Sequence, residues 1–132
     1  MQYSPGVMES LDLARTRMMI NELFRSIDNK DPVKFTSFLS PDCTFRFGNL
    51  PAVAGVVEIQ KFVAGFFDSV DSLSHEISDS WSISDGLICH GHVTYTRKDG
   101  SMLTVPFANI FKLGAAGISE YQIFADTSQL YL

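Results

Sequence analysis

The stretch LICHGHVTYTRKDGSMLTVPFANIFKL, residues 87–113, contains two runs of alternating apolar and polar residues joined by a short turn. Alternation with a period of two is typical of strands, and Lys98-Asp99-Gly100 is typical of the turn of a hairpin. The same signals recur on both sides of this stretch. The carboxyl half of the chain is therefore predicted to be an antiparallel meander of four strands: Leu73–Ile83, Leu87–Arg97, Ser101–Leu113 and Ile118–Leu130.

Three helices are predicted ahead of the meander, because apolar residues recur there every three or four positions. The second helix is short: Asp31 is placed to cap its first turn, and Pro32 fits its first position. The third helix follows Gly55. These helices are expected over Met8–Asp28, Pro32–Leu39 and Val56–Val70, with a short strand over Cys43–Phe47 between the last two.

Helices followed by a meander predict the α+β class, in one domain over residues 8–132 that is preceded by a flexible arm of residues 1–7. Helices that cover the concave face of a curved sheet leave a pocket between the two layers. The apolar faces of both layers turn towards this pocket. We therefore expect Phe62, Phe66 and Phe107 to line a pocket for a small, largely apolar ligand.

The composition narrows the classes of partner. With 10 basic and 15 acidic residues among 132, the net charge is −5, and Lys and Arg form no cluster along the chain. A nucleic-acid ligand is therefore not expected. The amino end lacks a secretory signal and the apolar runs are short, so we predict a cytoplasmic protein without membrane contact. Cys43 and Cys89 fit that compartment as buried, reduced thiols.

Polar residues in register with apolar ones are the strongest candidates for function. His75 falls on the apolar face of the Leu73–Ile83 strand, and Asn109 on that of Ser101–Leu113. A buried polar group without a partner costs about 1–3 kcal/mol, so each should meet a polar partner, a water or a ligand. His75 is a candidate general acid or base, and Asn109 a candidate donor to a carbonyl or enol oxygen. The alternatives are a core histidine bonded to a backbone carbonyl or to Asp79, and an asparagine satisfied by a side chain or water.

Further polar residues are secondary candidates for ligand contact. Tyr95 lies on the apolar face of its strand, Asp79 is expected at the solvated mouth of the pocket, and Asp126 stands in the last strand. His90 and His92 point the same way, but on the polar face of their strand. Because no third ligand joins them at a recognised spacing, no metal site is predicted.

The order of elements, together with four local segments, resembles the nuclear transport factor 2-like superfamily, and within it the SnoaL-like group. The segments are Ile27–Asp31, Leu39–Phe45, Gly55 and Ile118–Asp126. The resemblance spans nearly the whole chain. It implies a cone-shaped fold in which three amino-terminal helices pack on a curved antiparallel sheet around a pocket, and a homodimer formed through the outer face of that sheet.

The resemblance also separates the possible activities. Steroid isomerases of this fold use a tyrosine and an aspartate at positions where this chain has Leu23 and Phe47. Limonene-type epoxide hydrolases use an Asp-Arg-Asp set near the positions of His90, His92 and Ile123. The residues needed for either chemistry are therefore missing from this chain.

Scytalone-dehydratase-like members match better. They carry a histidine at the start of the strand after the third helix and an asparagine in an Ala-Asn-aliphatic motif, which Leu73-Ser74-His75 and Ala108-Asn109-Ile110 reproduce. The dehydratase's helix-one aspartate, which orients a histidine, aligns near Arg25, and its first-strand tyrosine aligns near Phe47. The complete dehydratase set is therefore not expected.

The resemblance and the residues together predict a cofactor-free isomerase, dehydratase or polyketide-cyclase-like enzyme. In it His75 is the acid/base and Asn109 the orienting group, and the partner is a small apolar metabolite. The alternative is a module of the same fold that binds a ligand or dimerises without turnover.

Overall fold

The computed structural model describes residues 5–131, which form three helices and six strands. The amino-terminal half carries the helices and the first two strands, and the carboxyl half is a meander. In chain order the elements are α1 (Pro5–Asp28), α2 (Pro32–Thr36), β1 (Leu39–Phe47), β2 (Val53–Ala54), α3 (Val56–Asp68), β3 (Ser72–Ile83), β4 (Gly86–Thr96), β5 (Met102–Gly114) and β6 (Gly117–Ala125). The α+β class is confirmed.

All six strands belong to one sheet, in the order β2-β1-β6-β5-β4-β3. Neighbouring strands are antiparallel except β1 and β6, which run parallel, so the prediction of a wholly antiparallel sheet is wrong at this pair. The meander leaves one edge of β6 free, and β1 fills it. Because α3 and four strands lie between β1 and β6 in the chain, no hairpin forces their directions to be opposite.

The ends of several elements differ from the prediction. Helix α1 begins at Pro5, so residues 5–7 of the predicted arm are helical, while residues 1–4 of that arm lie outside the described residues. Helix α2 stops at Thr36, and its predicted cap is confirmed, because Asp31 accepts a hydrogen bond from the Lys34 amide at 3.0 Å. Strand β6 ends at Ala125, five residues before the predicted end at Leu130.

One strand changes the direction of its side chains part-way along. The pairing of β3 with β4 shifts between Ile77 and Asp79, which marks a β-bulge. Beyond it Ser80, opposite the buried Cys89, faces the helices, while Asp79 and Trp81 are exposed. The prediction that Asp79 lies at the mouth of the pocket, on the face of His75, is therefore wrong, because one extra residue reverses the alternation.

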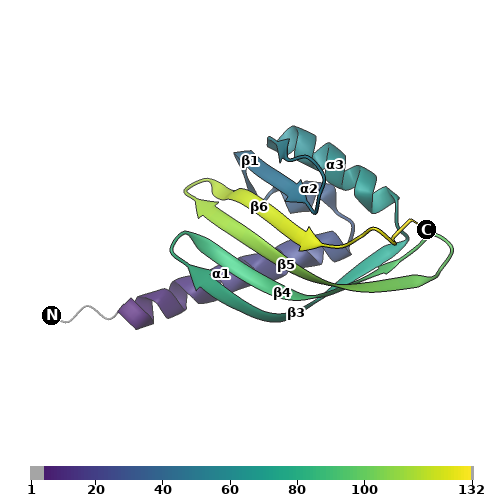
Figure 1. Ribbon diagram of the computed structural model, residues 1–132. Helices are drawn as coiled ribbons and strands as arrows, with labels where there is room; N and C mark the ends of the chain where they lie inside the picture. Colours follow the sequence, from purple (N-terminus) through teal and green to yellow (C-terminus); the bar gives the residue numbers. More distant parts are fainter. Residues whose placement is uncertain (1–4, 132) are drawn as a thin grey trace.

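The three helices lie on one side of the curved sheet, with α1 beside β3 and α3 beside β1 (Figure 1). We call the side of the sheet towards the helices the inner face and the opposite side the outer face. The core fills the space between the inner face and the helices. None of the described helices is long and apolar enough to cross a membrane.

The end of α1 is tied to the start of β3. Lys30 follows the helix in a left-handed conformation, with φ of 54°. Its Nζ donates hydrogen bonds to the carbonyl oxygens of Val70 and Asp71, each at 3.0 Å. This bridge holds the last turn of α1, which carries Asp28, against the first residues of β3.

Candidate functional site

A cavity of about 40 Å³ lies between the helices and the inner face of the sheet. A water molecule needs about 10–15 Å³ by this measure, so the cavity has room for a few waters. Seven of its seventeen lining residues are phenylalanines. The lining is Ile27, Phe35, Phe45, Phe47, Phe62, Val63, Phe66, Phe67, Leu73, His75, Val93, Tyr95, Phe107, Asn109, Tyr121, Ile123 and Ala125.

His75 and Asp28 form a doubly bonded pair at this cavity. The Nδ1 atom of His75 lies 2.7 Å from Oδ1 of Asp28, and the backbone N–H of His75 donates to Oδ2 of the same carboxylate at 3.0 Å. The histidine side chain is 11% exposed and the aspartate side chain 28% exposed. Because both carboxylate oxygens are engaged, the orientation of the imidazole ring is fixed.

The pair also sets which ring nitrogen is available. An aspartate that accepts from Nδ1–H holds the neutral imidazole in the tautomer whose Nε2 carries the lone pair. No hydrogen bond among the described residues engages Nε2. Phe24 and Phe107 flank the ring, with centroids at 4.9 and 5.3 Å from it. His75 is thus held rigidly, with one nitrogen free to exchange a proton.

The partner of His75 differs from those that the core alternative supposed, because the histidine bonds neither a backbone carbonyl nor Asp79. Arg25, which aligns near the helix-one aspartate of the dehydratases, is exposed and pairs with Glu22. The contact with His75 comes from Asp28, three residues further along the helix. Asp28 follows the buried Phe24 by four residues, so helical spacing alone places it at the edge of the apolar face.

Asn109 lies deep on the inner face, as predicted. It is 2% exposed, and its Oδ1 is buried without a hydrogen-bond partner among the described residues. Strand β5 pairs with β4 without a register shift from Met102 to Lys112, so the alternation that predicted the inward direction persists. The acceptor oxygen of a buried amide is thus available at the cavity.

Tyr121 is a site residue that the sequence analysis missed. It is 1% exposed, lines the cavity and has a hydroxyl that is buried without a partner among the described residues. The sequence does contain a local sign that Tyr121 points inward. The last strand alternates polar and apolar residues over Glu120–Ile123. Burial raises the pKa of Tyr121 well above its ordinary value, so the hydroxyl keeps its proton.

Three other ionisable groups of the inner face also stay protonated near neutral pH. Burial raises the pKa of Tyr95, which is 3% exposed and lines the cavity. It raises the pKa of Cys43 to about 11 and that of Cys89 to about 12. Both cysteines are buried and free, as predicted. Because a thiolate and not a thiol is the nucleophile, neither cysteine suits covalent chemistry.

The structure gathers most, but not all, of the predicted site residues. Phe62, Phe66 and Phe107 line the cavity together with His75, Asn109 and Tyr95. Asp79 is exposed on β3 beyond the bulge, and Asp126 is exposed just after β6. The Asp126 carboxylate accepts a hydrogen bond from the Ser128 amide at 3.0 Å, which lowers its pKa and closes a turn. Neither carboxylate belongs to the cavity.

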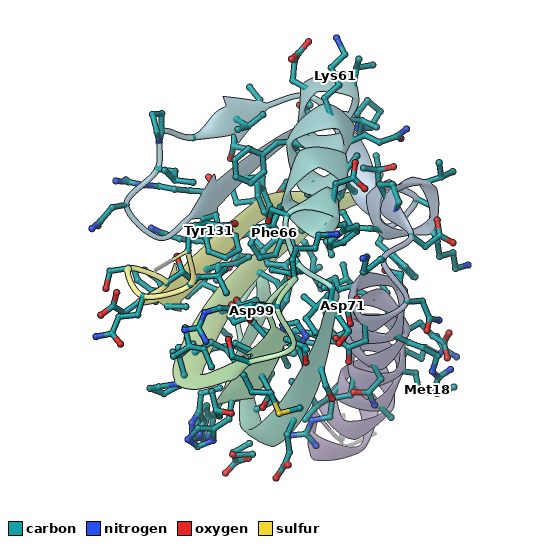
Figure 2. All side chains as sticks on the ribbon, turned by 90° about the vertical axis from the view of Figure 1, so that its right-hand side faces the viewer. Met18, Lys61, Phe66, Asp71, Asp99 and Tyr131 are labelled. Atoms are coloured by element: carbon teal, nitrogen blue, oxygen red, sulfur yellow. The ribbon has the colours of Figure 1, made fainter. Side chains whose placement is uncertain are left out.

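The carboxyl-terminal segment, residues 126–131, packs against the ends of α3 and β4. The hydroxyl groups of Tyr131 and Ser69 lie 2.8 Å apart, which joins this segment to the end of α3. Arg97 donates to the carbonyl oxygens of Gln129 and Leu130 at 2.8 and 2.9 Å. Figure 2 shows Phe66 between α3 and the sheet, with Tyr131 on the nearby carboxyl-terminal segment.

The outer face carries both of the remaining histidines. The imidazole of His90 stacks on the exposed indole of Trp81, with centroids 5.4 Å apart and an angle of 9° between the planes. His92 is exposed on the same face. Among the described residues, no three His, Cys, Asp or Glu side chains gather as a metal site would need.

The fold and the cavity together define a protein of the nuclear transport factor 2-like class. Residues 20–121 match the model of the SnoaL-like domain, which is about three quarters of the chain, and the chain belongs to this family. No curated protein matches it.

Solved structures show the same fold at low sequence identity. A protein of Jannaschia sp. CCS1, provisionally named a SnoaL-like polyketide cyclase, is 17% identical with a TM-score of 0.77, over 89% of this chain and 90% of that one. TerC, co-crystallised with polyporic acid, is 15% identical with a TM-score of 0.75, over 88% and 95% of the two chains. A ketosteroid isomerase-like protein of Catenulispora acidiphila, in complex with trimethylamine, is 13% identical with a TM-score of 0.74, over 80% and 83%.

Proposed function

We propose that this protein binds a small, largely apolar molecule in the cavity and acts on it by acid/base catalysis without a cofactor. The supporting observation is the His75–Asp28 pair. Its 2.7 Å contact orients the ring of a histidine that lines an apolar cavity and whose second ring nitrogen is free to accept a proton. Isomerisation, dehydration and cyclisation of a carbonyl compound can each begin with removal of a proton from the carbon next to the carbonyl group. We therefore propose one of these three reactions.

In the proposed reaction, Nε2 of His75 takes the proton from the substrate carbon, and the electron pair of the C–H bond moves towards the carbonyl oxygen. Asp28 stabilises the imidazolium that forms. The amide N–H of Asn109 donates to the enolate oxygen as negative charge develops on it. In isomerisation the imidazolium returns its proton to another carbon of the enolate, and in dehydration it gives the proton to a leaving hydroxide, which departs as water. In cyclisation the enolate carbon forms a bond to a second carbonyl carbon of the ligand, and the oxygen of that carbonyl takes the proton.

The family and the fold support this proposal at the level of ligand type. The SnoaL-like relative of Jannaschia sp. is provisionally a polyketide cyclase, and the TerC structure holds polyporic acid. The cavity volume of about 40 Å³ is too small for a ring. The half-buried Phe47, Phe62 and Phe66 must therefore move aside when a substrate enters.

His75→Gln is expected to lower proton abstraction about a hundredfold, since general bases contribute about 10²–10⁴-fold. The reaction to measure is the exchange of the α-protons of 2-tetralone for deuterium in D₂O, followed by proton NMR. Asp28→Asn should also slow exchange, because an amide cannot hold the imidazolium. His90→Gln is the matched control, because it removes an exposed histidine of the outer face.

Binding of 2-tetralone by His75→Gln separates the two roles of the site. If the variant binds the ketone as the wild type does but no longer accelerates exchange, the histidine is catalytic. Equal acceleration by the wild type and His75→Gln would contradict the acid/base proposal.

The second candidate is a module that binds a ligand or dimerises without turnover. The observation that favours it is the small volume of the cavity, about 40 Å³, which the protein's own phenylalanines line closely. Binding of 2-tetralone without exchange above that of His75→Gln would support this candidate.

We also propose a homodimer formed through the outer face. Trp81 on β3 and Phe124 on β6 are 50% and 48% exposed there, and burial of such side chains favours association. Trp81→Ser should shift sedimentation from dimer to monomer. Val57→Ser, which alters a side chain 67% exposed on α3, should not. A wild-type protein that sediments as a monomer at 100 µM, on the order of common interface affinities, would refute this proposal.

A further inference from the structure

We propose that Tyr121 and Asn109 form a hydroxyl-binding subsite in the buried part of the cavity, so that the ligand carries a hydroxyl group on an otherwise apolar ring. This inference rests on the proposed function, since it assumes that the cavity receives a ligand. It adds the chemical class of that ligand and assigns a role to Tyr121. The subsite uses the acceptor oxygen of Asn109, whereas the proposed reaction uses the N–H of the same amide.

The sheet register brings the two residues together. Asn109 on β5 lies opposite Ile123 on β6, and Tyr121 precedes Ile123 by two residues. Residues in this diagonal relation share a face of the sheet, with backbones about 7–8 Å apart. Both side chains line the cavity. The amide and the hydroxyl group thus approach one small region of the cavity from neighbouring strands.

Both groups are buried without partners, which is costly. Asn109 is 2% exposed and Tyr121 is 1% exposed, and neither Oδ1 nor the phenol oxygen has a hydrogen bond among the described residues. They do not bond each other, although they are neighbours. Buried polar groups are almost always paired in native proteins, and an unpaired one often marks a functional site.

Packing does not explain the hydroxyl of Tyr121. Its ring contacts Phe111, Phe45 and Phe35, with centroids at 4.5, 5.3 and 5.7 Å. A phenylalanine would make the same ring contacts and would leave no buried hydroxyl unpaired. The hydroxyl oxygen is therefore the atom of this side chain to which a ligand would supply the missing hydrogen bond.

The two groups together select the ligand by its hydrogen-bonding pattern. The phenol of Tyr121 keeps its proton and can donate, whereas Oδ1 of Asn109 can only accept. A single ligand atom that serves both must accept one hydrogen bond and donate another. A hydroxyl oxygen does this, while a carbonyl oxygen cannot donate. The lining beside the two groups, such as Val93 and Ile123, is apolar, which favours a neutral ligand group over a charged one.

Ring contacts link the subsite to the acid/base pair. Phe111 contacts Tyr121 and Phe24 contacts His75, and the rings of Phe111 and Phe24 also contact each other, with centroids 6.3 Å apart. Burial is the main cause of the raised pKa of Tyr121, and the charge of Asp28 adds to it. A ligand hydroxyl held by Tyr121 therefore orients the ligand relative to the His75–Asp28 pair.

The test compares phenol with toluene, two rings of similar size that differ by a hydroxyl group and a methyl group. Dissociation constants are measured by NMR titration of the wild type, Tyr121→Phe and the control Tyr131→Phe, whose tyrosine is 65% exposed. Tyr121→Phe is expected to weaken phenol binding about fivefold to tenfold, as the loss of one hydrogen bond does. Toluene binding should not change, and the control should behave as the wild type.

Two further measurements distinguish the loss of one hydrogen bond from a general loss of structure in Tyr121→Phe. The melting temperature of Tyr121→Phe should equal or exceed that of the wild type, because the substitution removes an unpaired buried hydroxyl. Asn109→Leu should weaken phenol binding in the same way. Unchanged phenol affinity in Tyr121→Phe would overturn the subsite and leave the proposed function intact. Failure of both probes to bind the wild type would overturn the proposed function and the subsite together.

Discussion

Gly91→Ala is expected to prevent stable folding, although it adds a single methyl group. A Cβ atom at this position would lie 1.9 Å from the backbone oxygen of Glu76 and 3.0 Å from the Cα of Ile77. Both atoms belong to the backbone of β3 beside the bulge, so no side chain can rotate away. We expect a loss of about 4 kcal/mol or more, which is a large part of the stability of an ordinary domain.

Gly65→Ala provides the matched control for Gly91→Ala. Gly65 is exposed in α3, and a Cβ built there meets nothing within 4 Å. Because alanine favours the helix, this variant should gain about 0.5–1 kcal/mol. Urea denaturation followed by circular dichroism measures both free energies of unfolding. A Gly91→Ala protein as stable as the wild type would show that β3 does not approach β4 so closely.

Phe111→Ala is expected to lower the free energy of unfolding by about 3–5 kcal/mol. Phe111 is 0% exposed on the inner face of β5. Its ring lies 4.5 Å from that of Tyr121 and 6.3 Å from that of Phe24, and therefore joins the sheet to α1. Removal of the ring leaves a void that these two elements cannot close without shifting.

Met102→Ala is the control for Phe111→Ala, since Met102 is a large apolar residue of the same strand but is 67% exposed. Its truncation should change stability by about 0.5 kcal/mol or less. Urea denaturation compares the two variants with the wild type. A similar, small effect of both substitutions would mean that Phe111 does not belong to the packed core described above.

Much of the fold was predictable because it depends on local patterns. Alternation along β4 and β5 predicted their inner faces, and the pairing of these strands runs without a register shift from Met102 to Lys112. Asn109 therefore points inward as predicted. The cap at Asp31 and the glycine-bearing turns likewise depend on residues close together in the chain.

The site was predictable only in part. His75 was found because three residues of alternation, Leu73 to His75, precede the bulge in β3. Asp79 was misplaced because it follows that bulge, whose position reflects how β3 fits against β4. Tyr121 was missed, although its strand alternates, because nothing in the sequence shows that its hydroxyl lacks a partner.

The sequence by itself determined the α+β class, the inner faces of the central strands and the inward direction of His75 and Asn109. Only the tertiary structure decided that Asp28 pairs with His75 across 47 residues, that β1 runs parallel to β6, and that Tyr121 shares a cavity with Asn109. The reason is physical. Periodicity reports which way a side chain points within its own element, whereas a pair or a cavity exists only after two elements have docked at one register and distance.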